Sequence, residues 1–158
     1  MIQHPFPPLY DKNSKILILG SFPSVKSREQ MFFYGHPQNR FWKVTSAVFK
    51  CEIPKTIEEK KQFLISNGIA LWDVIASCDI IGSSDSSIKN VIPNDLSPIL
   101  SNSQISAIFT NGKVSEKYYK KYTEKITGIP SVCLPSTSPA NAAWSIEKLI
   151  EAWKIIKL

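Results

Sequence analysis

Apolar residues along this chain gather in four short continuous runs. Runs of this kind, a few residues long and rich in Ile, Leu and Val, are typical of strands buried on both faces of a sheet. The predicted strands cover residues 15–20, 69–75, 105–112 and 131–136.

Between these runs, apolar residues recur at spacings of three and four, which predicts helices. Thr56 and Glu59 have the spacing of a capping box, and Asn67-Gly68 is a typical helix end. Further helices are predicted over residues 40–50 and 113–126 and on Ile146, Leu149, Ile150 and Trp153. Residues 21–36 lack this spacing, so a long loop is predicted there.

Two details of the later helices follow from the same spacing. One face of the helix over residues 113–126 is predicted to carry Val114, Tyr118, Tyr122 and Ile126. Ser138 followed by Pro139 has the pattern of an N-cap and first helical residue, with Asn141 as a later cap. The last helix is therefore predicted to begin near residue 138 or 141.

Alternating strands and helices predict an α/β fold, with a mostly parallel sheet covered by helices on both faces. The chain has 158 residues, of which 43% are hydrophobic. A chain of this length can bury one sizeable hydrophobic core but is too short for two ordinary domains. Residues 1–158 are therefore predicted to form a single domain. Because neither a signal-peptide pattern nor an apolar run of bilayer length is present, we expect a cytoplasmic protein without membrane contact.

The charge and the cysteines narrow the choice of partners. A net charge of +6 and a pI near 9.2 favour polyanions such as nucleic acid. The three cysteines, Cys51, Cys78 and Cys133, are far apart and lack histidines at ligand spacing, so we expect core thiols and no metal site.

Several familiar catalytic patterns are missing. The segment GSFPSVKS is neither a phosphate-binding P-loop nor a dinucleotide fingerprint, and no GxSxG nucleophile elbow occurs. His4 and His36 are the only histidines, and neither has the context of a catalytic triad. Hydrolysis through a serine or cysteine nucleophile is therefore disfavoured.

Ligands of parallel sheets bind beyond the carboxyl ends of the strands. The loops that leave the four predicted strands there are GSFPS, SCDIIGSSDSS, TNG and PSTSPANA. Together with the aromatic residues nearby, these small polar residues suit a pocket that stacks a flipped base and holds phosphates through backbone N–H groups.

Three segments in the right order resemble one family. ILGSFPS after the first strand, GHPQNRFW further on and LPSTSPANA after the last strand are similar to the uracil-DNA glycosylase superfamily, most of all to its hypoxanthine-DNA (deoxyinosine) glycosylase branch. The resemblance spans nearly the whole chain. It implies a three-layer α/β/α sandwich around a four-stranded parallel sheet.

The resemblance also implies hydrolysis of the bond between a damaged base and deoxyribose, without strand cleavage and without a metal or organic cofactor. The implied partner is double-stranded DNA, with single-stranded DNA left open, and the implied protein is a monomer that acts in base excision repair.

The first motif departs from the family pattern at Phe22. Uracil-removing relatives have Asp or Asn there to position the attacking water, which a phenyl ring cannot do. The resemblance to the deoxyinosine branch implies that Asn39 takes this role, with its amide oxygen holding the water. Asn39 is also a plausible N-cap of the following helix.

The resemblance implies that Phe41 stacks on the flipped base, although its place on the apolar stripe of its helix fits a core residue equally well. Gln38 is a candidate for reading a base edge, against the alternative of an exposed loop residue. Backbone N–H groups around Ser21 and Phe22, with polar groups near Ser136, are candidates for stabilising the departing base.

A further set of residues is expected near the DNA backbone. Ala140 stands about where some relatives have an arginine wedge, so the wedge here is blunt and favours weakly paired, deaminated bases. The helix over residues 113–126 offers further lysines, against the alternative of a merely solvated face. The candidates for DNA contact are Ser24, Lys26, Arg28, Ser138, Ala140 and Asn141.

The sequence is compatible with other substrates and with two other functions. Hypoxanthine is the favoured base, and uracil, mismatched thymine and xanthine stay possible, as in a mismatch-specific uracil/thymine enzyme. A catalytically silent nucleic-acid-binding domain of the same fold would bind DNA without releasing a base. A flavodoxin-like domain would instead bind a small nucleotide, with little dependence on salt.

Overall fold

The four predicted strands form one parallel sheet at the centre of the molecule. The computed structural model describes residues 1–158, and the strand order is β3-β2-β6-β7. The strands are β2 (Ile16–Gly20), β3 (Ile69–Asp73), β6 (Ala107–Asn111) and β7 (Ser131–Leu134). Every residue of β2 and β3 is buried, as their unbroken apolar runs predicted.

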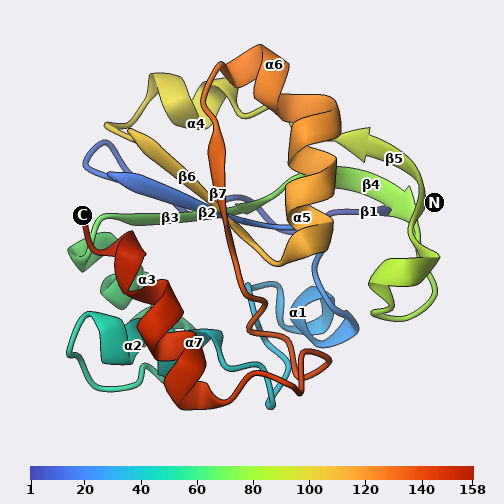
Figure 1. The fold of residues 1–158 in the computed structure, drawn as a ribbon. Coiled ribbons are helices and arrows are strands. Elements are labelled where there is room, and N and C mark those ends of the chain that lie inside the picture. The colour runs from blue at the N-terminus through green and yellow to red at the C-terminus, as the bar shows by residue number, and fades with distance from the viewer.

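Helices cover both faces of this sheet (Figure 1). One layer holds α2 (Phe41–Val48), α3 (Ile57–Ser66) and α7 (Ile146–Trp153). The other layer holds α4 (Ser97–Ser101), α5 (Lys113–Tyr118) and α6 (Glu124–Thr127). The predicted three-layer α/β/α arrangement with a four-stranded parallel sheet is confirmed.

A second, smaller sheet was not predicted. It is antiparallel, and its strands are β1 (Ile2–Gln3), β4 (Ile75–Asp79) and β5 (Lys89–Pro93). Because β4 follows β3 after a single residue, Val74, the sequence showed one apolar run and a loop where the structure has two strands. This sheet leads the N-terminal segment to the carboxyl edge of β3, where the His4 N–H donates to the Ala76 carbonyl at 2.8 Å.

The segment predicted as a loop over residues 21–36 contains the short helix α1 (Val25–Gln30). Ser24 is its N-cap and accepts a hydrogen bond from the Ser27 N–H at 3.2 Å. Six residues are too few for an apolar repeat, so the helix could not be found by periodicity.

The predicted helix over residues 113–126 is interrupted by a π-helical turn, η2 (Tyr119–Thr123). A wider turn changes which residues share a face beyond it. Ile126 is accordingly 74% exposed, so its predicted place beside Tyr118 is wrong.

The last helix begins later than predicted, at Ile146. Its N-cap is Ser145, whose hydroxyl accepts from the Lys148 N–H at 3.2 Å. Ser138 and Asn141 therefore cap no helix. The predicted capping box of Thr56 and Glu59 is present at the start of α3.

A single cluster of 32 buried hydrophobic residues joins the layers. Cys78 belongs to it, whereas Cys51 and Cys133 are exposed, so the prediction of core thiols is right for one cysteine of three. The remaining short elements are the 3-10 turns η1 (Asp85–Ser87) and η3 (Lys154–Ile156). No helix has the length and apolar character needed to cross a bilayer.

Candidate active site

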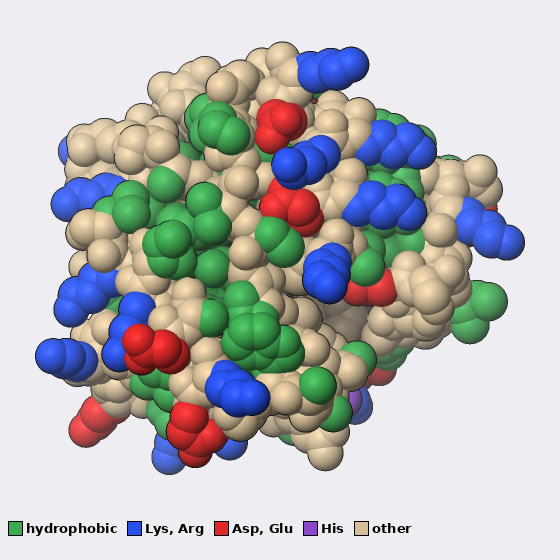
Figure 2. Space-filling view, in the orientation of Figure 1, with side chains coloured by type: hydrophobic (Ala, Val, Ile, Leu, Met, Phe, Trp, Pro, Cys, Tyr) green, Lys and Arg blue, Asp and Glu red, His purple; other side chains and the backbone are tan.

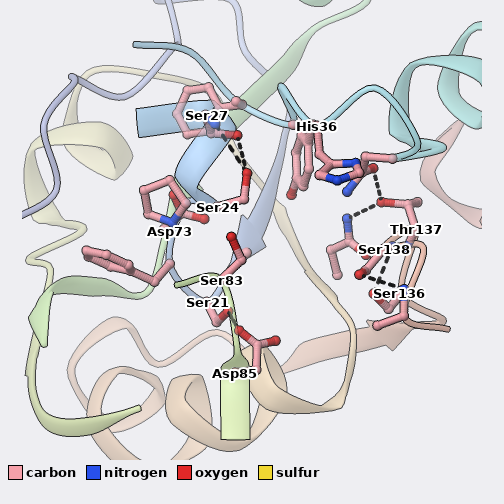
Figure 3. A pocket seen from close by; sticks show the side chains of 18 of the residues that line it. Ser21, Ser24, Ser27, His36, Asp73, Ser83, Asp85, Ser136, Thr137 and Ser138 are labelled. Atoms are coloured by element: carbon pink, nitrogen blue, oxygen red, sulfur yellow. Dashed lines mark hydrogen bonds between the residues drawn. The ribbon is translucent and has the colours of Figure 1, made fainter. Parts of the chain in front are cut away.

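A cavity of about 300 Å³ lies at the carboxyl edge of the parallel sheet (Figure 3). All four loops that leave this edge contribute to its wall, as the sequence predicted. Its lining includes Ser21, Phe22, Ser24, Tyr34, Asn39, Asp73, Asp85, Asn111, Ser136, Thr137, Ser138 and Ala140. No group of three or more His, Cys, Asp or Glu side chains is placed to hold a metal ion.

Asn39 lines the cavity with its amide group fixed. Its Oδ1 accepts hydrogen bonds from the Phe41 N–H and the Thr137 hydroxyl, both at 2.9 Å. Both lone pairs of the amide oxygen are thus used, and the prediction that this oxygen holds a water is wrong. The free polar group is the amide nitrogen, which donates to no protein atom.

The orientation of Asn39 is transmitted from β6 through Thr137, which is fully buried. The Nδ2 of Asn111 donates to Thr137 Oγ1 at 3.0 Å, and the Thr137 N–H donates to Asn111 Oδ1 at 3.0 Å. With its oxygen engaged by Asn111, the Thr137 hydroxyl directs its proton to Asn39. Asn111 and Thr137 were not predicted, because nothing in the sequence shows that they meet.

Arg40 holds the last loop against the Asn39 segment, and it too was not predicted. Its guanidinium donates to the carbonyls of Ser138 at 3.1 Å, Asn141 at 3.0 Å and Trp144. Its backbone N–H donates to the Thr137 carbonyl at 3.0 Å. Arg40 therefore fixes the loop that supplies the hydroxyl for Asn39.

Phe41 lies outside the cavity and in the core. It is completely buried, with Trp42 and Trp153 edge-on to its ring. Tyr34 stacks on its face with 4.1 Å between ring centroids. Phe41 thus cannot reach a base, and the core alternative is correct.

Tyr34 is an aromatic residue of the cavity wall that was not predicted from the sequence. It lines the cavity, and its backbone is left-handed, with φ of 51°. Its hydroxyl is buried and has no hydrogen-bond partner in the protein. Burial, assisted by the charge of Asp73, raises the pKa of Tyr34, so the hydroxyl stays protonated.

Ser21 and Phe22 form one wall, as predicted. Phe22 is 8% exposed, and the Ser21 hydroxyl donates to Asp85 Oδ1 at 3.1 Å. The backbone N–H groups of these two residues donate to no protein acceptor. Loss of solvent around the Asp85 carboxyl raises its pKa, and the bond from Ser21 acts in the opposite sense.

Asp73 and His4 form a buried pair that was not predicted. Asp73 ends β3 opposite Gly20, and its Oδ2 lies 2.7 Å from His4 Nε2. Both side chains are at most 6% exposed. Asp73 lay inside an apparent apolar run, and His4 stands 69 residues earlier, so only the tertiary structure brings them together.

The candidates of the first loop are largely occupied within the protein. Ser24 caps α1, and Lys26 is an exposed residue that pairs with Glu29 at 3.5 Å. Arg28 donates to the Gly82 carbonyl at 2.8 Å and lies over the Phe22 ring. Only Ser24 of the first-loop DNA candidates lines the cavity.

The candidates of the last loop lie at the mouth of the cavity. Ser136 and Ser138 are joined by a bond from the Ser138 N–H to Ser136 Oγ at 3.1 Å, and Ala140 is exposed beside them. Asn141 braces the loop by donating to the Ser136 carbonyl at 3.0 Å. Gln38 is exposed and does not line the cavity, which agrees with the alternative of an exposed loop residue.

A groove of about 580 Å³ continues from the cavity across Ser136, Ser138 and Ala140. Lys113 and Trp144 lie along it. Lysine side chains gather over the neighbouring α5, and the surface is hollowed below them (Figure 2). Asp85 also lines the groove, so the positive charge of this face comes from the lysines beside it. A groove beside such a cluster of lysines can follow a nucleic-acid backbone.

The fold and the site together define a nucleic-acid enzyme scaffold of a known class: residues 7–157 match the sequence profile of the Uracil DNA glycosylase superfamily, and the chain belongs to this family. Two named relatives are more specific. The chain is 34% identical to the Hypoxanthine DNA glycosylase of Methanosarcina acetivorans, over 99% of this chain and 98% of that protein. It is 32% identical to the Hypoxanthine DNA glycosylase of Methanosarcina barkeri, over 86% of each.

The fold has a close structural counterpart as well. A solution NMR structure of a uracil-DNA-glycosylase-like protein from Methanosarcina acetivorans superposes with a TM-score of 0.82 and 31% identity, covering 100% of both chains.

Proposed function

We propose that this protein is a monofunctional DNA glycosylase that hydrolyses the N-glycosidic bond of hypoxanthine in a nucleotide flipped out of DNA. The observation that carries the proposal is the fixed amide of Asn39 in a base-sized cavity whose first loop has Phe22 in place of an acid or amide. The names of the two Methanosarcina relatives support hypoxanthine as the base.

Asn39 acts through its amide nitrogen. The nitrogen donates to the oxygen of a water molecule and holds it against C1′ of the sugar. An amide cannot remove a proton from this water, but glycoside cleavage passes through an oxocarbenium-like transition state. Such an electrophile is reactive enough for a well-placed neutral water, whose surplus proton ends on the departing base anion, so positioning is the main contribution of Asn39.

The departing base receives its stabilisation from the opposite wall. As the glycosidic bond breaks, negative charge develops on the base, and the free N–H groups of Ser21 and Phe22 are donors for it. A single fixed donor of this kind contributes about 10²–10³ in rate. The rings of Phe22 and Tyr34 are apolar surfaces against which the base can pack.

The DNA contacts follow from the groove and the charge. Lys113 of α5, Ser136 and Ser138 line the groove that the strand would follow. Ala140 gives the last loop a small tip, so extrusion relies on weak pairing of the damaged base. The enzyme acts as a monomer on double-stranded DNA, and neither a metal nor an organic cofactor enters the reaction.

The test is single-turnover incubation of the purified protein with duplexes that carry hypoxanthine, uracil, xanthine or mismatched thymine, followed by mild alkali to cleave abasic sites. We expect release of hypoxanthine, with equal activity in EDTA. Faster release of uracil or thymine would assign a different base to the same site. Binding to damaged duplex without release of any base would make the protein a silent DNA-binding domain.

A further inference from the structure

The groove beside the cavity has a wall that a DNA backbone does not need. The volume of the groove is about 580 Å³, against about 300 Å³ for the cavity. An uncharged part of its lining consists of Gly112, Cys133, Leu134, Pro135 and Trp144. An apolar wall offers a charged phosphate no hydrogen bonds, so this part of the groove suits a different part of the strand.

Trp144 brings an aromatic ring to this wall. Its side chain is partly buried and packs against the core, and its remaining surface lines the groove. The indole N–H groups of Trp42 and Trp153 donate to backbone carbonyls, whereas that of Trp144 has no protein acceptor and is not enclosed. An aromatic side chain that is open on one side is a surface on which a nucleic-acid base can stack.

The position of Trp144 is fixed by the loop that carries it. The guanidinium of Arg40 donates to the carbonyls of Trp144 and Asn141, the latter at 3.0 Å. Asn141 in turn donates to the Ser136 carbonyl at 3.0 Å. Because the loop is held before a ligand arrives, binding at Trp144 costs little ordering of the protein.

The place of the groove identifies its occupant. Asp85, Ser136, Ser138 and Ala140 line both the cavity and the groove, so the two are continuous. A strand whose flipped nucleotide fills the cavity therefore brings the adjacent nucleotide to the groove. Lys113 also lines the groove, is exposed and forms no ion pair, so it is available to the phosphate of that nucleotide.

Building on the proposed glycosylase function, we propose that the groove is a second base-binding subsite, in which the base of the nucleotide adjacent to the flipped one stacks on Trp144 while its phosphate lies beside Lys113. To enter, the adjacent base has to leave its own pair and stack. The subsite is therefore filled in single-stranded DNA and left empty where the neighbour is paired, and it gives the enzyme affinity for hypoxanthine in single strands.

The first measurement changes the substrate and leaves the protein unaltered. Single-stranded oligonucleotides carry one hypoxanthine, and the nucleotide on its 5′ or its 3′ side is replaced by a tetrahydrofuran analogue, which keeps the phosphate and lacks the base. Single-turnover release is measured with the enzyme below saturation. We expect the replacement on one side to slow release about 10-fold, the size of one base–aromatic stack, and that on the other side to change it less than about 3-fold.

The second measurement removes the ring. Trp144→Leu keeps an apolar side chain against the core, so thermal unfolding should show a folded protein. Release from single strands should fall about 10-fold and release from duplexes should change less than about 3-fold. In this variant, deletion of the neighbouring base should have no further effect, because both changes remove the same stack.

Two further variants serve as controls. Trp144→Phe keeps an aromatic ring and should retain most of the release from single strands. Tyr10→Leu removes another partly buried aromatic ring that packs against the core but lines neither the cavity nor the groove, so release should be unchanged.

The outcomes distinguish the subsite from the function on which it rests. Release that is indifferent to both neighbouring bases, or that occurs from duplexes alone, would overturn the subsite and leave the glycosylase intact. A loss in Trp144→Leu that adds in full to the loss from base deletion would also overturn it. Failure to release hypoxanthine from single strands and duplexes alike would instead overturn the glycosylase function itself.

Discussion

The Thr137 hydroxyl donates to the amide oxygen of Asn39 at 2.9 Å, across 98 residues of sequence. This bond, with the one from the Phe41 N–H, decides which atom of Asn39 faces the cavity. The amide group of Asn39 therefore presents its donor, and not its acceptor, to the cavity.

Asn39→Asp isolates the amide nitrogen. The carboxylate keeps an oxygen to accept from Thr137 and from the Phe41 N–H, while the donor that faces the cavity is replaced by a charged acceptor. We expect base release to slow about 10²-fold or more, with the fold retained, measured by single-turnover kinetics and thermal unfolding. An Asp variant as fast as the unaltered protein would show that an acceptor, not a donor, holds the water.

Asn39→Ser provides the companion measurement. A serine hydroxyl can still accept from the Phe41 N–H at the start of α2, so the free energy of unfolding should stay within about 1 kcal/mol of its original value. Release of hypoxanthine should fall about 10²-fold because the amide is gone. Unchanged kinetics in this folded variant would reduce Asn39 to a local brace of α2.

Thr137→Val removes the hydroxyl and keeps the shape of the side chain. Asn39 loses a donor and Asn111 loses an acceptor, which costs about 1–3 kcal/mol of stability. With the Asn39 amide free to rotate, we expect about a 10-fold lower rate of base release at saturating enzyme, of the size that one lost hydrogen bond produces. Thr137→Ser keeps the hydroxyl and is the control, so an equal loss in both variants would contradict the bond.

Two substitutions distinguish the role of Tyr34 from that of Phe41. Tyr34→Phe deletes a hydroxyl without a protein partner, so stability should change by less than about 1 kcal/mol while hypoxanthine release slows. Phe41→Leu opens space in the core and should cost about 1–3 kcal/mol, with little effect on release in the folded fraction. The reverse pattern would restore Phe41 as the residue that contacts the base.

The raised pKa of Asp85 predicts that the stability of the protein depends on pH. Its pKa is raised above the unfolded value of 3.8, so the folded protein binds the proton more tightly than the unfolded chain does. Stability from this group is therefore present at low pH and is lost as the pH rises through the window above 3.8. Chemical denaturation of Asp85→Asn should show less loss of stability over that window than the unaltered protein shows, and a steeper loss would contradict the assignment.

Patterns among residues close together in the chain were sufficient to predict the main strands and helices. Apolar runs in β2 and β3 and the capping box at Thr56 depend on residues close together in the chain, so burial and helix start could be predicted from the sequence. Short elements such as α1 and β1 were missed because two to six residues carry no readable period.

The candidate site, too, could be predicted from the sequence only in part. Parallel strands that alternate with helices share one carboxyl edge, so the loops with Ser21 and Ser136 could be placed around one cavity from the sequence. Asn39 was assigned to the site only through the family resemblance. Phe41 could not be assigned, because a position on an apolar stripe is the same for a residue that faces the core and one that faces a ligand.

The sequence by itself determined the parallel sheet and the edge at which the cavity lies, and its resemblance to the family pointed to Asn39. The tertiary structure alone decided which atom of Asn39 is free, and it brought His4 to Asp73 and Asn111 to Thr137. The reason is physical: periodicity reports burial within one element, whereas hydrogen bonds between distant loops depend on how the packed elements place their ends.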